Sequence, residues 1–220
     1  MTEVATCPSC GAPGLEPFHR VAGAPVHSVT LIPSRSAARA LATGIISLGL
    51  CGRCGFISNM AFDAGLQDYS RDYESSQIHS GVFSAFHREL AGDLVSRHGL
   101  HGRSVIEIGC GQGEFLRLLC DLGAGRGVGF DPAYDGERQD LPESVTVVKD
   151  YFSERYADVE ADFICCKMTL EHIPDTGGFL RIVRRALGDR RNATVFFQVP
   201  HAGRILDEVA FWDVYYEHCS

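Results

Sequence analysis

The chain has 220 residues and a formal net charge of −8, with 20 Lys and Arg against 28 Asp and Glu. This acidic balance disfavours a nucleic-acid-binding protein, which normally presents a basic face, and the chain lacks the roughly 18-residue apolar run that spans a membrane. The amino terminus has no secretory pattern, so we expect a cytoplasmic protein whose 9 cysteines are reduced thiols. We expect neither nucleic acid nor a membrane as a partner.

Residues 1–62 have the pattern of a small metal-binding domain. Two Cys-x-x-Cys pairs lie in it: Cys7, Cys10, Cys51 and Cys54. Four thiolates suit a structural zinc ion, which favours tetrahedral coordination. Gly11 and Gly55 follow the second cysteine of each pair, where a positive φ would point backbone N–H groups at the thiolates. We expect residues 26–32 and 44–50 to form the strands that carry the two turns.

A polar and aromatic segment, residues 63–80, follows as a linker and cofactor lid. Beyond it, apolar residues recur at helical spacing from residue 82 to 95, and residues 81–220 form the second predicted domain. Short apolar runs that suit buried strands alternate there with amphipathic helices. The runs are residues 104–109, 127–131, 144–150, 161–168 and 193–200. This order predicts an α/β fold with a doubly wound, parallel, Rossmann-like sheet, preceded by a small zinc-ribbon-like β domain.

The first strand and its helix are joined by a glycine loop, "EIGCGQGEF". Its glycines are Gly109, Gly111 and Gly113. The dinucleotide pattern G-x-G-x-x-G fails because Glu114 stands at the third position, and Glu107 lies two residues before the loop. Asp131 ends the second strand, where it can accept both ribose hydroxyls, and Asp150, beside Tyr151, ends the third, where it could meet an adenine amino group. Three acids at strand ends favour a cationic adenosyl ligand, S-adenosylmethionine, and this region resembles the class I methyltransferases.

Several longer motifs resemble one family within that class. The cysteine pairs, "DYESSQIHS", "EIGCGQGEFLRLL", "GVGFDPAY", "LEHIPD" and "FWDVYYEHCS" are similar to the nucleotide-sugar C-methyltransferases, which methylate carbon 3 of 4-keto-deoxysugars. The resemblance implies bound S-adenosylmethionine, structural Zn²⁺ and a small nucleotide-sugar substrate. Besides the residues of the glycine loop and strand ends, the cofactor contacts that we assign are Gln77, Ser80, Pro132 and Lys167.

The resemblance also implies a catalytic set. Removing the C3 hydrogen beside a ketone requires a positioned base, and the enolate oxygen requires hydrogen-bond donors. The family match assigns His218 as the base, with Tyr215 and Glu217 beside it. His172, which follows the fourth strand, could donate to the keto oxygen, and Tyr69 could be a further donor on the substrate side.

The geometry of the last residues limits this set. An extended backbone would put Tyr215 and Glu217 on one face and Tyr216 and His218 on the other, so we expect Glu217 to lie away from the base unless the backbone turns.

Only five strands can be placed where the class ordinarily has seven, and the family has a second α/β domain beyond this point, so the chain is expected to be truncated. Two alternatives stay open: O- or N-methylation of another small molecule, and a non-catalytic fragment that binds zinc and S-adenosylmethionine. Amide or adenine-amine methylation is disfavoured, because "KMTLEHIPD" stands where that class has N-P-P-Y or D-P-P-Y.

Overall fold

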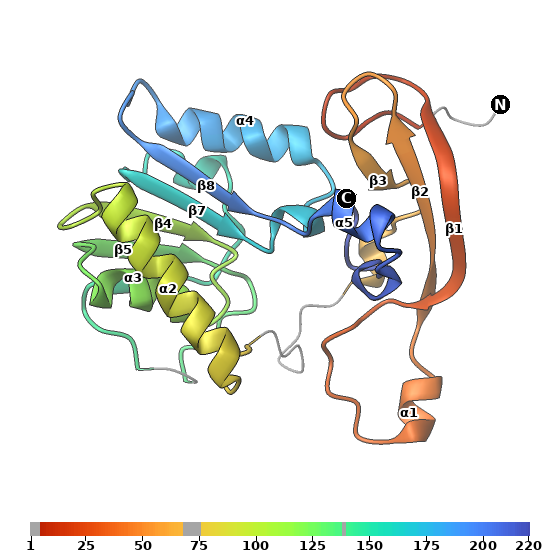
Figure 1. Cartoon of the computed structure of the whole chain (residues 1–220), viewed down its shortest axis with the longest axis horizontal. Coiled ribbons are helices and arrows are strands. Elements are labelled where there is room, and N and C mark those ends of the chain that lie inside the picture. The colour runs from red at the N-terminus through yellow and green to blue at the C-terminus, as the bar shows by residue number, and fades with distance from the viewer. Residues whose placement is uncertain (1–4, 68–75, 138–139) are drawn as a thin grey trace. The chain divides into compact units, whose positions relative to one another are not determined.

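The computed structural model describes residues 5–67, 76–137 and 140–220 (Figure 1). Its strands and helices are, in chain order, β1 (Leu15–Pro25), α1 (Arg35–Arg39), β2 (Thr43–Cys51), β3 (Ile57–Asn59), α2 (Gly81–Arg97), β4 (Ser104–Ile108), α3 (Glu114–Asp121), β5 (Arg126–Phe130), β6 (Val145–Val148), β7 (Phe163–Lys167), α4 (Thr176–Leu187), β8 (Thr194–Gln198) and α5 (Ala202–Asp207). Short 3₁₀ turns lie at Ala64–Leu66, Glu154–Tyr156, Leu170–His172 and Phe211–Asp213. None of these helices is both long enough and apolar enough to cross a membrane.

The chain divides into two compact units. The first, called here the cysteine unit, comprises Met1–Asp68, Leu170–Arg181 and Val199–Ser220; the second, the sheet unit, comprises Tyr69–Thr169 and Ile182–Gln198. The domain boundaries predicted at 1–62, 63–80 and 81–220 stay a prediction. The compact units have other bounds, because the C-terminal segment packs with the N-terminal one.

The sheet unit is built on a five-stranded sheet in the order β6-β5-β4-β7-β8, and all four strand pairs are parallel. The predicted α/β class and Rossmann-like architecture are confirmed. The chain leaves β4 in one direction through α3 to β5 and later leaves β7 in the other direction through α4 to β8. The strand order therefore reverses between β4 and β7, and the carboxyl ends of strands beside such a switch point are where sheets of this kind bind ligands.

One continuous core supports that sheet. It contains Ala91, Leu94, Val95, Leu100, Val105, Phe115, Leu116, Leu119, Ala124, Val145, Phe163 and Cys165. Helices α2 and α3 contribute the apolar residues of one face, and α2 begins at Ser80, whose hydroxyl accepts a hydrogen bond from the N–H of Phe83 at 3.3 Å. This N-cap fixes where the first helix of the unit starts.

The cysteine unit contains an antiparallel sheet in the order β1-β2-β3. The strand expected at residues 44–50 is present within β2, but the one expected at residues 26–32 is wrong, because the pairing strand is β1, Leu15–Pro25. Most of β1 is exposed and its ladder contains two register shifts, so it lacks the apolar pattern of a buried strand. Main-chain pairing with β2 defines this strand.

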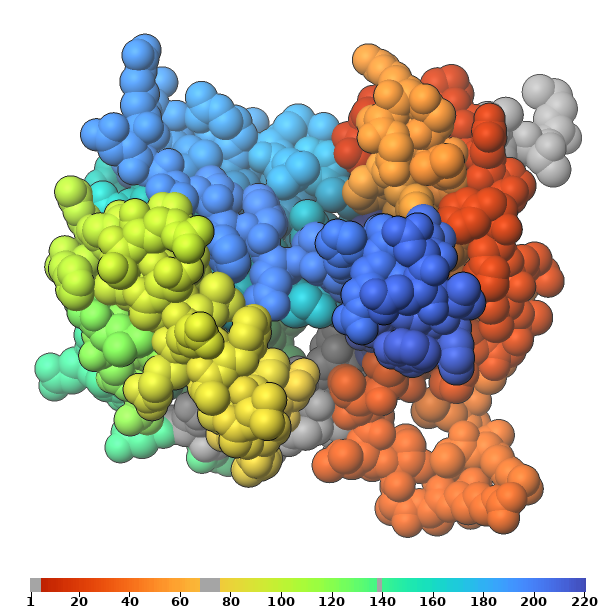
Figure 2. Space-filling model, viewed as in Figure 1, coloured from red at the N-terminus to blue at the C-terminus, as the bar shows by residue number. Residues whose placement is uncertain are grey.

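The last residues of the chain belong to the same unit as the first. The N–H of Asn59, at the end of β3, donates to the carbonyl of Cys219 at 2.9 Å. In the space-filling view the C-terminal segment, in blue, lies against the orange and red N-terminal residues (Figure 2). The segment from Tyr215 onward is thus built into a folded unit.

Candidate functional site

Four thiols meet in the cysteine unit: Cys7, Cys10, Cys51 and Cys54. The Sγ atoms of Cys7 and Cys54 lie 3.7 Å apart, as do those of Cys10 and Cys51, and all four lie within 4.8 Å of one another. Zinc–sulfur bonds of about 2.3 Å in a tetrahedron place the sulfurs roughly 3.8 Å apart. The cluster could therefore hold a zinc ion, and four thiolates would leave that ion no position for a substrate.

The two cysteine turns have the same local geometry. Gly11 N–H donates to the carbonyl of Cys7, and Gly55 N–H donates to that of Cys51, both at 2.8 Å. The glycines have the predicted positive φ, +71° and +75°, which costs a residue without Cβ little. The glycines' own N–H groups close the turns on backbone carbonyls, while the main chain of Arg53 and Cys54 hydrogen-bonds to the Cys51 thiol and that of Phe56 to the Cys54 thiol, as predicted for backbone N–H groups in these turns.

In the sheet unit, the glycine loop joins the end of β4 to α3. Gly109, Gly111 and Gly113 have φ values of +71°, +56° and +82°, a region that side chains rarely adopt. A Cβ added at Gly109 would overlap the side chain of Thr169. The N–H groups of the three glycines bond within the protein, but no side chain caps α3 at Gly113, so no capping side chain occupies the N–H groups of its first turn.

Asp131, directly after β5, fastens this loop. Its Oδ2 accepts a hydrogen bond from Gly111 N–H and its Oδ1 accepts one from Ala133 N–H, both at 2.8 Å. Burial raises the pKa of Asp131, while these two hydrogen bonds act to lower it. Pro132 lies in the turn that the Tyr134 N–H closes on the Asp131 carbonyl at 3.4 Å. Each carboxylate oxygen has a further lone pair, as an acceptor for two ribose hydroxyls requires.

A buried ion pair lies across the switch point. Glu107 on β4 is 1% exposed, and its Oε1 lies 3.7 Å from Nζ of Lys167 at the end of β7. The ammonium also lies 4.1 Å from the centre of the Phe115 ring. Burial raises the pKa of Glu107 to about 7, although Lys167 acts to lower it. The two predicted cofactor residues are thus side by side, and Met168, which follows them, has an unusual φ of +47°.

Asp150 and Tyr151 lie beyond β6. The carboxylate of Asp150 accepts hydrogen bonds from Tyr156 Oη at 2.7 Å, Arg155 Nη1 at 2.9 Å and Tyr151 N–H at 2.8 Å. The first of these bonds is the main reason that the pKa of Asp150 is lowered. The sequence did not indicate that Tyr156 and Arg155 engage this acid, while the ring of Tyr151 is exposed.

The other predicted cofactor contacts precede α2. Ser80 is the N-cap of that helix, and the carbonyl of the exposed Gln77 accepts a hydrogen bond from Ser80 N–H at 3.0 Å. Ser76, which precedes Gln77 within the predicted lid, donates to Glu114 Oε1 at 2.6 Å, which ties this segment to the start of α3. Tyr69, the predicted substrate-side donor, lies outside the described residues.

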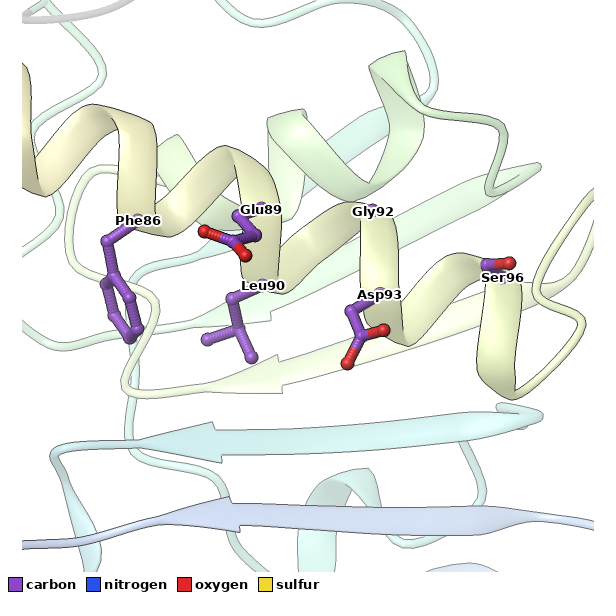
Figure 3. Close-up of a pocket in the computed structure, with 6 residues that line it drawn as sticks. All are labelled: Phe86, Glu89, Leu90, Gly92, Asp93 and Ser96. Atoms are coloured by element: carbon purple, nitrogen blue, oxygen red, sulfur yellow. The ribbon is translucent and has the colours of Figure 1, made fainter.

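A hollow of about 680 Å³ runs along α2. Figure 3 shows its lining residues, which all project from this one helix: Phe86, Glu89, Leu90, Gly92, Asp93 and Ser96. None of the predicted cofactor or catalytic residues lines it, so it is separate from the site at the strand ends.

The predicted catalytic residues of the cysteine unit meet in a turn. His218 N–H donates to the carbonyl of Tyr215 at 3.2 Å, and the two rings lie 3.9 Å apart. The ring of His172 lies 5.0 Å from that of His218 at an angle of 76°. An extended backbone would have placed Tyr215 and His218 on opposite faces, but the backbone turns here and brings these two residues to the same side.

Glu217 and Tyr216 have other partners. Glu217, 1% exposed, accepts hydrogen bonds from the N–H and the hydroxyl of Ser28, and Nδ1 of His27 lies 3.7 Å from its Oε1. The hydroxyl of Tyr216 accepts from Asp63 N–H at 2.8 Å. These two side chains anchor the turn to the N-terminal segment, and the expected separation of the Glu217 side chain from His218 is retained.

Burial sets the protonation of the cluster formed by Glu171, His172, Tyr215 and His218. It lowers the pKa of His172, and together with repulsion from His172 it lowers the pKa of His218 to about 3. It raises the pKa of Tyr215 to about 12 and that of Glu171 to about 7. Both histidines are consequently neutral at pH 7 and can accept a proton.

Sequence reasoning missed three contributors to these sites. The sequence motif "LEHIPD" contains Glu171, which was not predicted as a site residue. Its position directly before the candidate histidine His172 was a signal that could have identified it. Thr169, against the glycine loop, and Ser28, which binds Glu217, carry no local signal, because their partners lie far away in the sequence.

A parallel sheet with a glycine loop at its switch point and an acid after the next strand defines an α/β protein that binds a nucleotide-like cofactor. A family described as methyltransferase domain matches residues 83–220, more than half of the chain, so the chain belongs to that family. No curated protein sequence matches the chain.

The chain is similar to solved methyltransferase structures, one of which has a TM-score above 0.5. A candidate S-adenosyl-L-methionine-dependent methyltransferase from Methanococcus maripaludis is 14% identical, with a TM-score of 0.52 over 66% of this chain and 75% of that chain. One from Listeria monocytogenes is 17% identical, with a TM-score of 0.38 over 51% and 56%. The plantazolicin methyltransferase BpumL, in complex with SAH, is 16% identical, with a TM-score of 0.43 over 66% and 65%. The chain thus spans 56% of the Listeria protein and 65% of BpumL.

Proposed function

We propose that the chain is the zinc- and cofactor-binding part of an S-adenosylmethionine-dependent enzyme that methylates carbon 3 of a nucleotide-linked 4-keto-deoxysugar. The methyltransferase fold supports the cofactor, and the sequence motifs support the substrate class. The observation that carries the reaction type is the turn at Tyr215–His218, in which neutral histidines and a tyrosine meet. Methyl transfer to carbon needs such a base, because a carbon nucleophile must first be made.

The residues at the strand ends fit the cofactor. When bound, S-adenosylmethionine supplies an electrophilic methyl group on a sulfonium. The glycine loop lets the main chain approach the ligand, and Asp131 would accept the ribose hydroxyls. The partly compensated charge of Glu107 would favour the cationic end of the ligand, and the exposed ring of Tyr151 would stack on the adenine, with Asp150 at its edge. Gln77, Ser80, Pro132 and Lys167 complete the proposed contacts.

The proposed chemistry at the substrate is proton transfer. A lone pair on the ring of His218 takes the proton from carbon 3, and the electron pair of the broken C–H bond becomes the enolate. Tyr215 and Tyr69 would donate hydrogen bonds to the enolate oxygen, whereas Nδ1 of His172 donates to the carbonyl of Glu217, so its Nε2 would accept and not donate. The enolate carbon would then take the methyl group from the sulfonium, whose carbon–sulfur bond would break to leave a neutral thioether, and His218 would return its proton to water. Glu217 would hold the turn in place through Ser28.

Solvent exchange tests this proposal directly. With a nucleoside-diphosphate 4-keto-deoxysugar in deuterated water, NMR should show that the chain exchanges the C3 hydrogen, and His218→Ala should remove that exchange without weakening S-adenosylmethionine binding in calorimetry. His19→Ala, at an exposed position on β1, is the matched control.

Each failure has a separate meaning. Cofactor binding without any exchange by the parent would overturn C-methylation and favour O- or N-methylation. Cofactor binding without methyl transfer to any acceptor would favour a non-catalytic fragment, no cofactor binding would overturn the proposal, and unchanged exchange in His218→Ala would move the base to His172.

A further inference from the structure

Glu171 is a buried acid with an unusual environment. It lies in the 3₁₀ turn after β7, is 3% exposed, and neither carboxylate oxygen has a hydrogen-bond partner in the described part of the chain. Its main chain is held firmly, because its carbonyl accepts hydrogen bonds from Cys219 N–H at 2.8 Å and from the Cys219 thiol at 3.2 Å. A buried carboxyl that is fixed in position yet unpaired is costly, which suggests a use for it.

The carboxyl lies next to both histidines of the cluster. One of its oxygens and one ring nitrogen each of His172 and His218 all lie within 4.8 Å of one another. Nδ1 of His172 lies 3.0 Å from the carbonyl of Glu217, which can only accept, so Nδ1 carries the hydrogen and Nε2 keeps its lone pair. The ring of His218 similarly has a hydrogen bond to the main chain of Asp213.

The cluster without a negative charge would be a poor base. Burial and the neighbouring His172 lower the pKa of His218 to about 3, so its imidazolium form is strongly disfavoured. A carboxylate within 4.8 Å of a ring nitrogen of His218 favours the imidazolium, because opposite charges at this separation attract strongly where water is largely excluded.

We propose that Glu171 is the positioning residue of the base: its carboxylate stabilises the imidazolium that forms when His218 takes the substrate proton. This inference rests on the proposed function. In its ionised form Glu171 acts as the acid of a Ser-His-Asp triad does, stabilising the imidazolium without itself taking the substrate proton. The C3–H bond breaks, its proton joins the ring nitrogen of His218, and its electron pair stays with the enolate until the methyl group is transferred. The imidazolium then loses its proton to water.

Other titratable groups near Glu171 also act on this cluster, so the effect of Glu171 on the pKa of His218 must be distinguished from theirs. The titratable groups that face it or act on the same cluster are His172, Tyr215, His218, Cys219, Glu217, Asp213 and, through Glu217, His27. Glu217 raises the pKa of His172, but its carboxylate accepts from Ser28 and lies outside the cluster in which Glu171 meets both histidines. Glu217→Gln is therefore the matched control for Glu171→Gln, since each removes one buried carboxylate from the same region.

The first test is independent of substrate. NMR titration of the chain labelled with ¹⁵N-histidine measures the pKa of His218. In Glu171→Gln this pKa should be lower than in the parent by at least one unit, a tenfold loss of proton affinity. In Glu217→Gln the pKa of His172 should fall instead, while that of His218 stays. An unchanged His218 in Glu171→Gln, with retained amide dispersion, overturns the inference. If that variant unfolds, Glu171→Asp provides the same reading, with a smaller change.

The second test uses the reaction. Because Glu171 ionises near pH 7, exchange at C3 should rise with pH through about 7, and Glu171→Gln should be at least tenfold slower without that rise. A variant that keeps the parent's pH profile would contradict the inference. So would a second bound equivalent of zinc that Glu171→Gln removes, since the three side chains would then be metal ligands. No exchange by the parent itself, with the histidine titration as expected, would remove the proposed function alone.

Discussion

The two units of this protein are stabilised in different ways. Among the described residues, the sheet unit has a large apolar core against its parallel strands. The described apolar clusters of the cysteine unit are smaller, and they lie around Val26, Ile46 and Tyr216 and around the cysteines. A small antiparallel sheet cannot bury enough apolar area to be stable without further links. Its order therefore depends on a few specific contacts, whereas that of the sheet unit is distributed over many residues.

The two units also present their functional residues differently. In the sheet unit, strand ends and one loop supply the groups, so neighbouring positions in the sheet become neighbours in the site. In the cysteine unit, segments near residues 28, 172 and 217 come together from distant parts of the sequence. A single substitution at one of these contacts should consequently unfold the cysteine unit. A single substitution in the site of the sheet unit should only weaken the binding of its cofactor.

The largest expected effect is the loss of a zinc ligand. Structural zinc contributes roughly 10–16 kcal/mol of apparent binding free energy in small zinc domains, so Cys51→Ser should unfold the cysteine unit and leave the sheet unit folded. Hydrogen exchange followed by mass spectrometry should show lost protection in β2 and retained protection in β4 and β7. Cys120→Ser, at a free thiol of the sheet unit, is the control and should keep the metal. Equal loss in both units would contradict the comparison.

Removing the acid at the second strand should affect binding and leave the fold. Asp131→Ala should lose hydrogen bonds to both ribose hydroxyls, about 1.5–3 kcal/mol for each charged bond. Calorimetry with S-adenosylmethionine measures the change. Asp121→Ala, at a half-exposed position where the acid pairs with Arg117 at 3.5 Å, should bind as the parent does. Parent-like affinity in Asp131→Ala would show that this acid does not contact the ribose.

The buried Glu107 should make the sheet unit sensitive to pH. Its pKa is about 7 in the folded chain against 4.5 ordinarily, so the folded state binds the proton more readily. The associated stability is fully present below about pH 4.5 and is lost as pH rises through 7, a change of about 3 kcal/mol. Urea unfolding of the sheet unit at pH 5 and pH 8 should show this fall, and Glu107→Gln should reduce it. If the free energy of unfolding depends on pH in the same way in the parent and in Glu107→Gln, burial of Glu107 is not the cause of the fall.

A smaller effect is expected where β2 approaches the C-terminal turn. A Cβ at Gly44 would overlap the ring of Tyr216, which is 1% exposed and stacks on Phe62 at 5.5 Å. Gly44→Ala should lower the free energy of unfolding of the cysteine unit by about 1–3 kcal/mol. Gly52→Ala, where an added Cβ meets open space, should have little effect. Denaturant titration of both variants measures the difference.

The sequence alone determined those features that depend on local chemistry. Short continuous apolar runs predicted the five parallel strands, and helical spacing predicted helices α2, α3 and α4, because both patterns lie within a single segment. The glycine loop and the cysteine turns were predicted for the same reason, since a positive φ restricts the residue itself.

Tertiary structure decided what depends on contacts between distant segments. The main-chain ladder of β1, the turn that joins Tyr215 to His218, and the burial of Glu171 beside two histidines have no local pattern. Nothing local in the last residues predicts that the backbone turns there. The turn is held by the contacts of Tyr216 with Asp63 and of Glu217 with Ser28. A side chain's partner and its pKa are set by the residues that the fold brings around it, and no window of sequence contains them.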